Sequence, residues 1–424
     1  MAERVINHEM KERFTASAVK QAVLLKHGDD PAIGPGQLMV RVFVEAADDE
    51  GLAGWQRAHQ AGIEEFRREL SLRLPSARLL EFTYNEPGAA RIDVPDDGSL
   101  AAEQLSGREI VTKAMELLRA NYVFPDEAER AAVAIEARLE AGEYDGLDEI
   151  TLTDRVTGHL QDITGDKHLR LRLGGGPGPR REPPKRPDRE KMRKMGRLDN
   201  FGIRRVERLN GNVGYIDLRR MAVPANAGPA IAAAMELVAG TYALIIDMRH
   251  NGGGAPEGVV FWCSYLFDGE PTHLNDIFRA DTGETRQFWT LPYVPGTRYP
   301  DPPVYVLTSE RTFSGGEDLC YTLQALGRAQ VIGETTGGGA HPTRPFPVSP
   351  AVHIGIPFAR SVNPVTGTNW QGTGVVPDVA VPQAQAYDVA YARALKHVLA
   401  TDGVPPPIAD EARDALAAGV WSGR

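Results

Sequence analysis

Residues 304–327 combine an apolar strand, a turn of small residues and a helix, and Ser314 stands where the helix is expected to begin. A serine on such a turn is exposed, and the amides that follow it point free N–H groups at the atom its oxygen attacks. This arrangement suits a nucleophile. Ser314 could equally be an ordinary N-cap, because serine is a favoured capping residue and leucines follow at helical spacing.

A glycine-rich loop could supply the second part of the chemistry. Gly252, Gly253 and Gly254 follow the strand-like sequence YALIIDMR and lead into another helical segment. Consecutive glycines let a backbone approach a substrate closely and present N–H donors. With the amide of Gly315, such a loop could form an oxyanion hole, although a plain turn would have the same sequence. The chain lacks the G-x-x-x-x-G-K-[ST] and G-x-G-x-x-G patterns, so no nucleotide site is predicted.

Composition limits the class of protein. The chain has 424 residues, of which 42% are hydrophobic and 25% charged, which is typical of a globular protein with two or three domains. The net charge is −10 and there is no long basic block, so neither nucleic acid nor a membrane is an expected partner. No apolar run approaches the roughly 20 residues that span a bilayer. We therefore expect a soluble, cytoplasmic protein.

Cysteine and histidine spacing gives no sign of a metal or other cofactor. Cys263 and Cys320 lie in apolar helical stretches and are expected to be core residues. Several histidines have no partner at the spacing of metal ligands, namely His27, His59, His159 and His353.

Sequence patterns divide the chain into five segments. Residues 1–104 mix strands with a helix over 53–70 and predict a small α+β module, whereas residues 105–173 predict a bundle of amphipathic helices. The sequence over 174–200 is rich in Gly, Pro and charge and predicts a linker. Residues 201–385 alternate strands and helices, which favours a largely parallel sheet flanked by helices, and residues 386–424 predict a helical tail.

Four motifs follow one another along the chain: DMRHNGGG, TSERTFSGGEDL, GRAQVIGETTGGGAHP and NPVTGTNWQGTGVVPDV. In sequence and order they resemble the motifs of the S41 peptidases, in the branch that includes the tricorn protease and interphotoreceptor retinoid-binding protein. The resemblance covers roughly residues 106–382. It implies a crotonase-like β/α core. The helical region of this branch ends in a GDxHL motif, which here is Gly165 to Leu169.

The resemblance implies roles for individual residues. Ser314 becomes the nucleophile, and Gly253 and Gly315 the oxyanion amides. The lysine that serves as base in the processing proteases is absent from the segment 333–339, so a Ser-Lys dyad is not expected. A histidine from the helical region is used instead in tricorn-like enzymes, and His168 occupies its place; imidazole can take and return a proton near neutral pH.

Two positions depart from the tricorn pattern. Lys167 replaces a serine, and Gln371 stands where a glutamate completes the catalytic network; an amide can hydrogen-bond but cannot offer a negative charge to an imidazolium. His341 lies near the place of the dyad lysine, as a base or substrate contact or simply as a packed loop histidine. Gly252 and Gly254 are expected to contact substrate.

The sequence thus predicts a serine-type peptidase that acts on peptide or protein substrates through an acyl-enzyme on Ser314, with His168 as base. A non-catalytic protein that binds a hydrophobic ligand or peptide on the same scaffold is the main alternative. Another acyl-transfer enzyme on a crotonase-like core is a third, without any feature that indicates coenzyme A. Members of this family often assemble, so a homo-oligomer is open.

Overall fold

The computed structural model describes residues 19–26, 38–44, 63, 77–83, 90–93, 105–173 and 189–419. In the first segment four strands form a sheet in the order β1-β2-β3-β4, in which only the central β2 and β3 are parallel. The helix expected over 53–70 lies, apart from residue 63, outside the described residues. The strands are β1 (Val19–Lys26), β2 (Leu38–Val44), β3 (Ala77–Thr83) and β4 (Ala90–Asp93).

Three amphipathic helices form the second segment: α4 (Gly107–Asn121), α5 (Pro125–Glu140) and α6 (Glu149–Thr164). Their ends are specified locally. Ser106 and Glu109 form a capping box before α4, Asp148 caps α6, and Gly165 ends α6 in the left-handed conformation.

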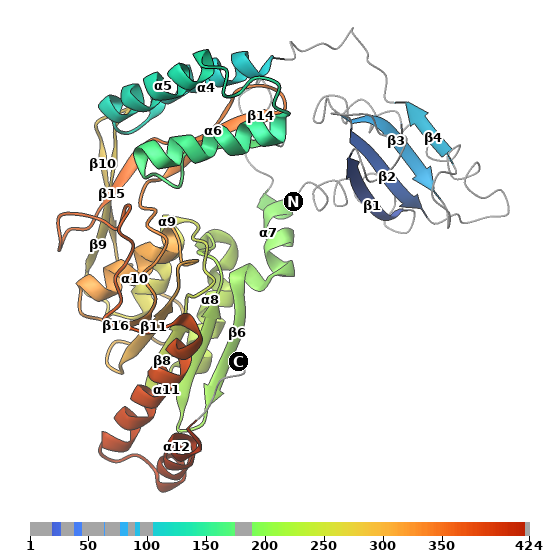
Figure 1. The fold of residues 1–424 in the computed structure, drawn as a ribbon. Helices are drawn as coiled ribbons and strands as arrows, with labels where there is room; N and C mark the ends of the chain where they lie inside the picture. The colour runs from blue at the N-terminus through green and yellow to red at the C-terminus, as the bar shows by residue number, and fades with distance from the viewer. Residues whose placement is uncertain are drawn as a thin grey trace, which may run out of the picture.

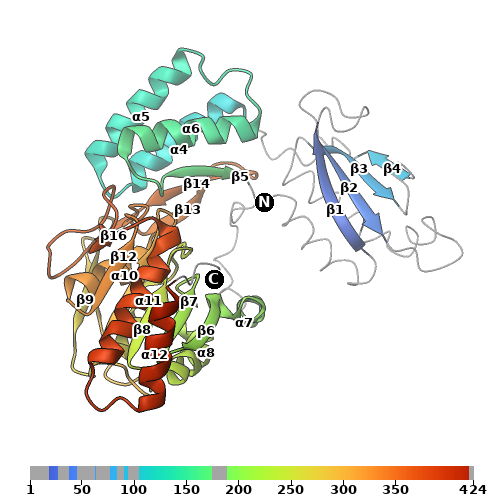
Figure 2. The same ribbon diagram turned by 60° about the horizontal axis from the view of Figure 1, so that its bottom comes forward.

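The bundle packs on a small antiparallel sheet that joins distant parts of the chain. Its order is β13-β14-β5, from β13 (Thr343–Pro347), β14 (Val352–Pro357) and β5 (Arg170–Leu173). Leu171 and Ile354 share one apolar core with Val111 and Ile135 of the helices. Figure 2 shows β5 and β14 directly below these helices. The bundle over 105–173 is therefore completed by residues from the segment predicted as the core.

A six-stranded sheet lies at the centre of the following residues (Figure 1). Its order is β16-β12-β11-β8-β7-β6, and only β6 runs antiparallel to its neighbour. Four of these strands are continuous apolar or nearly apolar runs, as strands covered on both faces require. The strands are β6 (Ile203–Leu209), β7 (Val213–Leu218), β8 (Ala243–Asp247), β11 (Val304–Thr308), β12 (Ala329–Gly333) and β16 (Val379–Ala380).

Helices cover both faces of this sheet. Ile246 and Val306 point to a core shared with α8 (Pro224–Val238), α9 (Pro256–Tyr265) and α10 (Gly315–Ala325). Ile245 and Leu307 point to the opposite core. That core is shared with α11 (Gln383–Ala400) and α12 (Pro406–Ala418). The chain is a mixed α/β protein, and the predicted alternation of strands and helices is confirmed.

Two boundaries differ from the prediction. The expected linker over 174–200 contains a helix, α7 (Arg189–Leu198), followed by a short 3₁₀ turn over Asn200–Gly202; residues 174–188 lie outside the described part. The sequence predicts a helical tail over 386–424. The first helix of this region, α11, instead starts at Gln383 and buries Ala390, Ala394 and Leu395. The small residues of α11 let it pack closely on the sheet, so it belongs to the core.

A third small sheet, β10-β9-β15, stands beside α10 and consists of β9 (His273–Arg279), β10 (Thr285–Trp289) and β15 (Ala359–Val362). Cys263 and Cys320 are buried free thiols in α9 and α10, as expected. No helix in the described part of the chain is both long and apolar enough to cross a membrane.

Candidate active site

Ser314 occupies a strained turn between β11 and α10. Its backbone has φ 53° and ψ −125°, a conformation that non-glycine residues rarely adopt and that costs on the order of 1–3 kcal/mol. The turn is held from behind, since Phe313 N–H donates to the carbonyl of Asn251 at 2.9 Å and the hydroxyl of Thr312 donates to the carbonyl of Met248 at 2.9 Å. This turn, which we call the elbow, is therefore held by hydrogen bonds to the glycine-rich loop that follows β8.

Glu317 locks this elbow to the loop after β12. The side chain is fully buried, and one carboxylate oxygen accepts the N–H of Ser314 at 2.8 Å and that of Gly339 at 2.8 Å. The other oxygen accepts the Thr336 hydroxyl at 2.5 Å and the N–H of Gly338 at 2.6 Å. A capping box predicts only the first of these bonds. Glu317 is thus the structural centre of the site.

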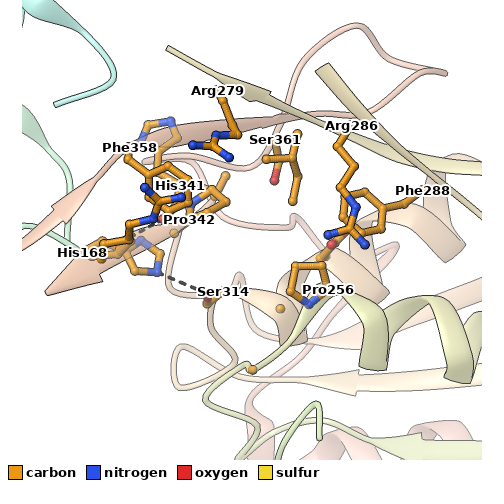
Figure 3. Close-up of a pocket in the computed structure, with 18 of the residues that line it drawn as sticks. His168, Pro256, Arg279, Arg286, Phe288, Ser314, His341, Pro342, Phe358 and Ser361 are labelled. Atoms are coloured by element: carbon orange, nitrogen blue, oxygen red, sulfur yellow. Dashed lines mark hydrogen bonds between the residues drawn. The ribbon is translucent and has the colours of Figure 1, made fainter. Parts of the chain in front are cut away.

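His168 faces Ser314 from the end of the helical bundle. Its Nε2 lies 3.3 Å from Ser314 Oγ, and its ring packs at a centroid distance of 4.7 Å on Phe313 (Figure 3). The residue lies between α6, which ends at Thr164, and β5, which is held by its pairing with β14. Gly339 makes room for the ring, because a Cβ there would lie 2.6 Å from His168 Cε1. Two residues 146 positions apart are thereby brought together.

Asp166 lies behind His168 and accepts hydrogen bonds from three residues. Its carboxylate accepts the His168 backbone N–H at 2.9 Å, the Tyr122 hydroxyl at 3.1 Å and the His341 Nδ1–H at 2.7 Å. Burial works to raise the pKa of Asp166, but the bond from His341 holds it below its ordinary value. His168 Nδ1 lies 3.7 Å from Asp166 Oδ1 and has no hydrogen-bond partner among the described residues. A small closure would complete the chain Asp166, His168, Ser314.

The glycine loop supplies amides, although not all of those expected. Gly253 packs against the elbow, where a Cβ would lie 2.7 Å from that of Ser314, and its N–H donates to Asn251 Oδ1 at 2.8 Å. The role of Gly253 as an oxyanion donor stays a prediction, and in this structure its N–H is used by Asn251. The N–H groups of Gly254 and Gly315 have no acceptor in the described residues, and both glycines line the hollow at Ser314.

Two hollows flank the pair of Ser314 and His168. The larger has a volume of about 600 Å³, and its wall includes Ile277, Phe288 and Trp370 together with Gly254 and His341. Figure 3 shows the labelled side chains around it. The smaller has about 560 Å³ and reaches Gly252 and strands β5 and β14. Gly252, Gly254 and His341 thus lie where a substrate could contact them.

Gln371 and Lys167 support the loop over 337–341 rather than the reacting atoms. Gln371 Oε1 accepts the N–H of Ala340 at 2.7 Å, and Lys167 Nζ donates to the carbonyl of Gly337 at 2.6 Å. No hydrogen bond of the described residues joins Gln371 to His168 or Ser314, so its place in a catalytic chain stays a prediction. The carboxylate beside His168 comes instead from Asp166. An Asp two residues before a His is common in turns, so the sequence alone gives little reason to assign Asp166 this role.

Two family models match the chain. One, described as peptidase family S41, matches residues 212–381, and the other, described as the N-terminal domain of Peptidase_S41 in eukaryotic IRBP, matches residues 104–195. The chain belongs to peptidase family S41. This confirms the resemblance inferred from the four motifs and supports a hydrolase that acts as a peptidase.

Solved structures similar to this S41 chain are distant. A lipoprotein from Streptococcus agalactiae is 12% identical, with 69% of this chain and 97% of that chain covered and a TM-score of 0.45. The photosystem II D1 C-terminal processing protease is 16% identical, with 71% and 99% covered and a TM-score of 0.41. The tricorn protease is 14% identical, with 78% of this chain but 37% of that chain covered and a TM-score of 0.41.

Asp318 is a third buried carboxyl group of this S41 site, after Glu317 and Asp166, and lines the larger hollow. Asn275 Nδ2 donates to both of its oxygens at 3.2 Å, while Asn275 Oδ1 is buried without a partner among the described residues. Burial raises the pKa of Asp318 from 3.8 to about 6. The folded state therefore holds a proton that the unfolded state has lost between these values, and stability falls as pH rises through this window.

Asp318→Asn is accordingly expected to raise the free energy of unfolding by about 2–3 kcal/mol at pH 8, and by much less at pH 4. The new amide has no charge to desolvate, and it can donate to Asn275 Oδ1 once the Asn275 amide flips. Urea unfolding at the two pH values measures the difference. An equal change in the free energy of unfolding at pH 4 and at pH 8 would contradict the assignment of Asp318 as a desolvated acid.

Proposed function

We propose that this S41 chain is a serine peptidase that hydrolyses peptide bonds through an acyl-enzyme on Ser314, with His168 as general base and Asp166 as the carboxylate that orients it. The approach of His168 Nε2 to Ser314 Oγ, at 3.3 Å on a strained elbow, is the observation that supports this most. A hydroxyl is a weak nucleophile until a neighbouring base takes its proton. Both groups lie at the junction of two hollows that could hold the two sides of a peptide.

In the proposed reaction, Ser314 Oγ attacks the carbonyl carbon while its proton passes to His168 Nε2. The N–H groups of Gly254 and Gly315 stabilise the resulting oxyanion. The C–N bond then breaks as His168 returns the proton to the leaving amine. A water molecule, activated by the same imidazole, releases the acyl group from Ser314. Asp166 holds the ring and stabilises the imidazolium if its oxygen closes on Nδ1.

The scaffold in this proposal is a crotonase-like core over 201–385, extended by α11, with the bundle over 105–173 carrying the base. The segment 1–104 would then be an accessory α+β module that recruits substrate or a partner. Deletion of residues 1–104 that left a folded protein with unchanged activity on its natural substrate would remove this role.

A mixed peptide library tests the function directly. Wild type and Ser314→Ala are incubated with the library, and mass spectrometry identifies new peptide termini. New termini from wild type alone would support the peptidase and give its sequence preference. No cleavage by folded wild type would favour a protein that binds a hydrophobic ligand or peptide without chemistry.

The pH dependence of cleavage provides an independent check. Burial lowers the pKa of His168 to about 4, and the charges of His341, Arg170 and Arg172 act in the same direction against Asp166. Because a general base must be neutral, kcat/KM is expected to stay level down to about pH 5 and to fall only near pH 4. An acid limb near 6.5, the ordinary histidine value, in protein shown by circular dichroism to stay folded would contradict a desolvated base.

A further inference from the structure

The sheet β13-β14-β5 has two very different faces. One carries Leu171, Ile354 and Phe346 into the core under the helical bundle. Because side chains alternate along a strand, the next residues point the other way. That second face carries Arg170 and Arg172 of β5, which pair with Gly355 and His353 of β14. It is one wall of the smaller hollow, which begins at His168 and Ser314.

This face, which we call the arginine face and define as Arg170, Arg172 and His353, is cationic. No Asp or Glu of the described residues lines the smaller hollow. Arg172 is exposed and forms no ion pair within the described residues. Arg170 is half-buried and donates from Nε to the carbonyl of Lys167 at 3.0 Å, and it forms no ion pair with a carboxylate of the described residues.

Asp166 is the acid of the described residues that acts on Arg170, and its oxygens already accept other hydrogen bonds. Asp166 accepts from Tyr122, His341 and the His168 backbone, and its charge acts on Arg170 less strongly than the charge of Arg172 does. Burial lowers the pKa of Arg170, and the charge of Arg172 adds to this, which is the sign of two cations placed close together. Such a pair is stabilised when an anion binds between them.

The larger hollow is different, because its arginines have carboxylate partners. Arg279 pairs with Asp281 at 2.7 Å, and Arg286 pairs with Glu257 at 2.9 Å. Among the described residues that line the two hollows, Arg170 and Arg172 are therefore the arginines without a carboxylate partner, and both line the smaller hollow.

We propose that the arginine face binds a carboxylate of the peptide substrate beside the bond that is cleaved. This rests on the proposed peptidase function and names its substrate class. A guanidinium presents a planar set of donors that matches a carboxylate, and a site next to Ser314 would place that carboxylate within a few residues of the cut. The carboxylate comes either from an Asp or Glu side chain or from the C-terminus of the peptide.

Matched fluorogenic peptides, built on the best sequence from the library, separate these sources. One pair differs only by Glu or Gln at each position near the cut, and another ends in a free acid or an amide. Wild type is expected to cleave one acidic member about tenfold faster in kcat/KM than its neutral partner, since ionic hydrogen bonds are stronger than neutral ones. In Arg172→Gln this ratio is expected to fall towards one, and Arg172→Lys should restore part of it.

Arg204→Gln is the matched control, because Arg204 is an exposed arginine on β6 in the central sheet. Its acid-to-neutral ratio should equal that of wild type. A ratio of one in wild type, or an unchanged ratio in folded Arg172→Gln, would overturn the proposal.

Binding to Ser314→Ala keeps this test separate from the peptidase proposal. Fluorescence anisotropy with the same labelled peptides, at low and high salt, should show tighter binding of the acidic member that weakens with salt. Acid preference in binding without any cleavage by wild type would support the arginine face and reject the peptidase. Cleavage by wild type without any preference for the acidic peptide would support the peptidase and reject the arginine face.

Discussion

His168→Ala is expected to lower kcat for peptide hydrolysis by about 10⁴–10⁶-fold, close to the loss in Ser314→Ala. Without the imidazole, no described group within reach of Ser314 Oγ can take its proton. His341, the other histidine of the site, donates from Nδ1 to Asp166 at 2.7 Å and is buried against Phe124. Steady-state rates on a peptide from the library measure the loss.

The double variant separates a shared mechanism from independent effects. Serine and base act as a unit, so Ser314→Ala with His168→Ala should be hardly slower than either single variant. His397→Ala on α11 is a suitable control. The His397 ring nitrogen lies near Thr401 at the end of that helix, and α11 packs on the face of the central sheet opposite to the helix that follows the elbow. If His168→Ala kept more than a tenth of the wild-type rate, the assignment of the base would be wrong.

Local sequence predicts the elbow and the central sheet well. Strands β8 and β11 are short apolar runs bounded by polar turns, and Ser314 follows the second of them, so pattern and spacing suffice. The role of the three consecutive glycines can also be predicted from sequence, because such a run has few uses other than a close approach of the backbone to another group. These patterns do not reveal which glycine N–H remains free to bind an oxyanion. In the structure the N–H of Gly253 donates to Asn251 and is not free.

Non-local pairing accounts for most of what the sequence did not reveal. Strand β5 is four residues long and gains its place by pairing with β14, some 180 residues later, and this pairing creates the arginine face. Spacing also placed Gln371 by analogy with a glutamate, whereas its side chain bonds to Ala340. Helix α7 was missed because charge dominates its sequence, REKMRKMGRL, and hides the helical pattern.

Glu317→Gln should cause the largest loss of stability among single changes at the site. The carboxylate accepts four hydrogen bonds, two at each oxygen, from donors that include the N–H groups of Ser314, Gly338 and Gly339. An amide of the same shape replaces one oxygen by NH₂, so two donors then face a donor. At about 1–3 kcal/mol for each buried group left unpaired, the free energy of unfolding should fall by about 2–5 kcal/mol. Urea unfolding measures it.

The same change should also lower kcat, because Glu317 holds the strained Ser314 backbone at φ 53° against relaxation. A shift of the hydroxyl by a fraction of an ångström would lengthen its 3.3 Å approach to His168, and we expect a loss of about 10²-fold in protein kept folded at low temperature. Glu310→Gln, an exposed neighbour in the same turn, should change neither quantity. Wild-type stability and rate in Glu317→Gln would mean that the elbow is held by the glycine loop alone.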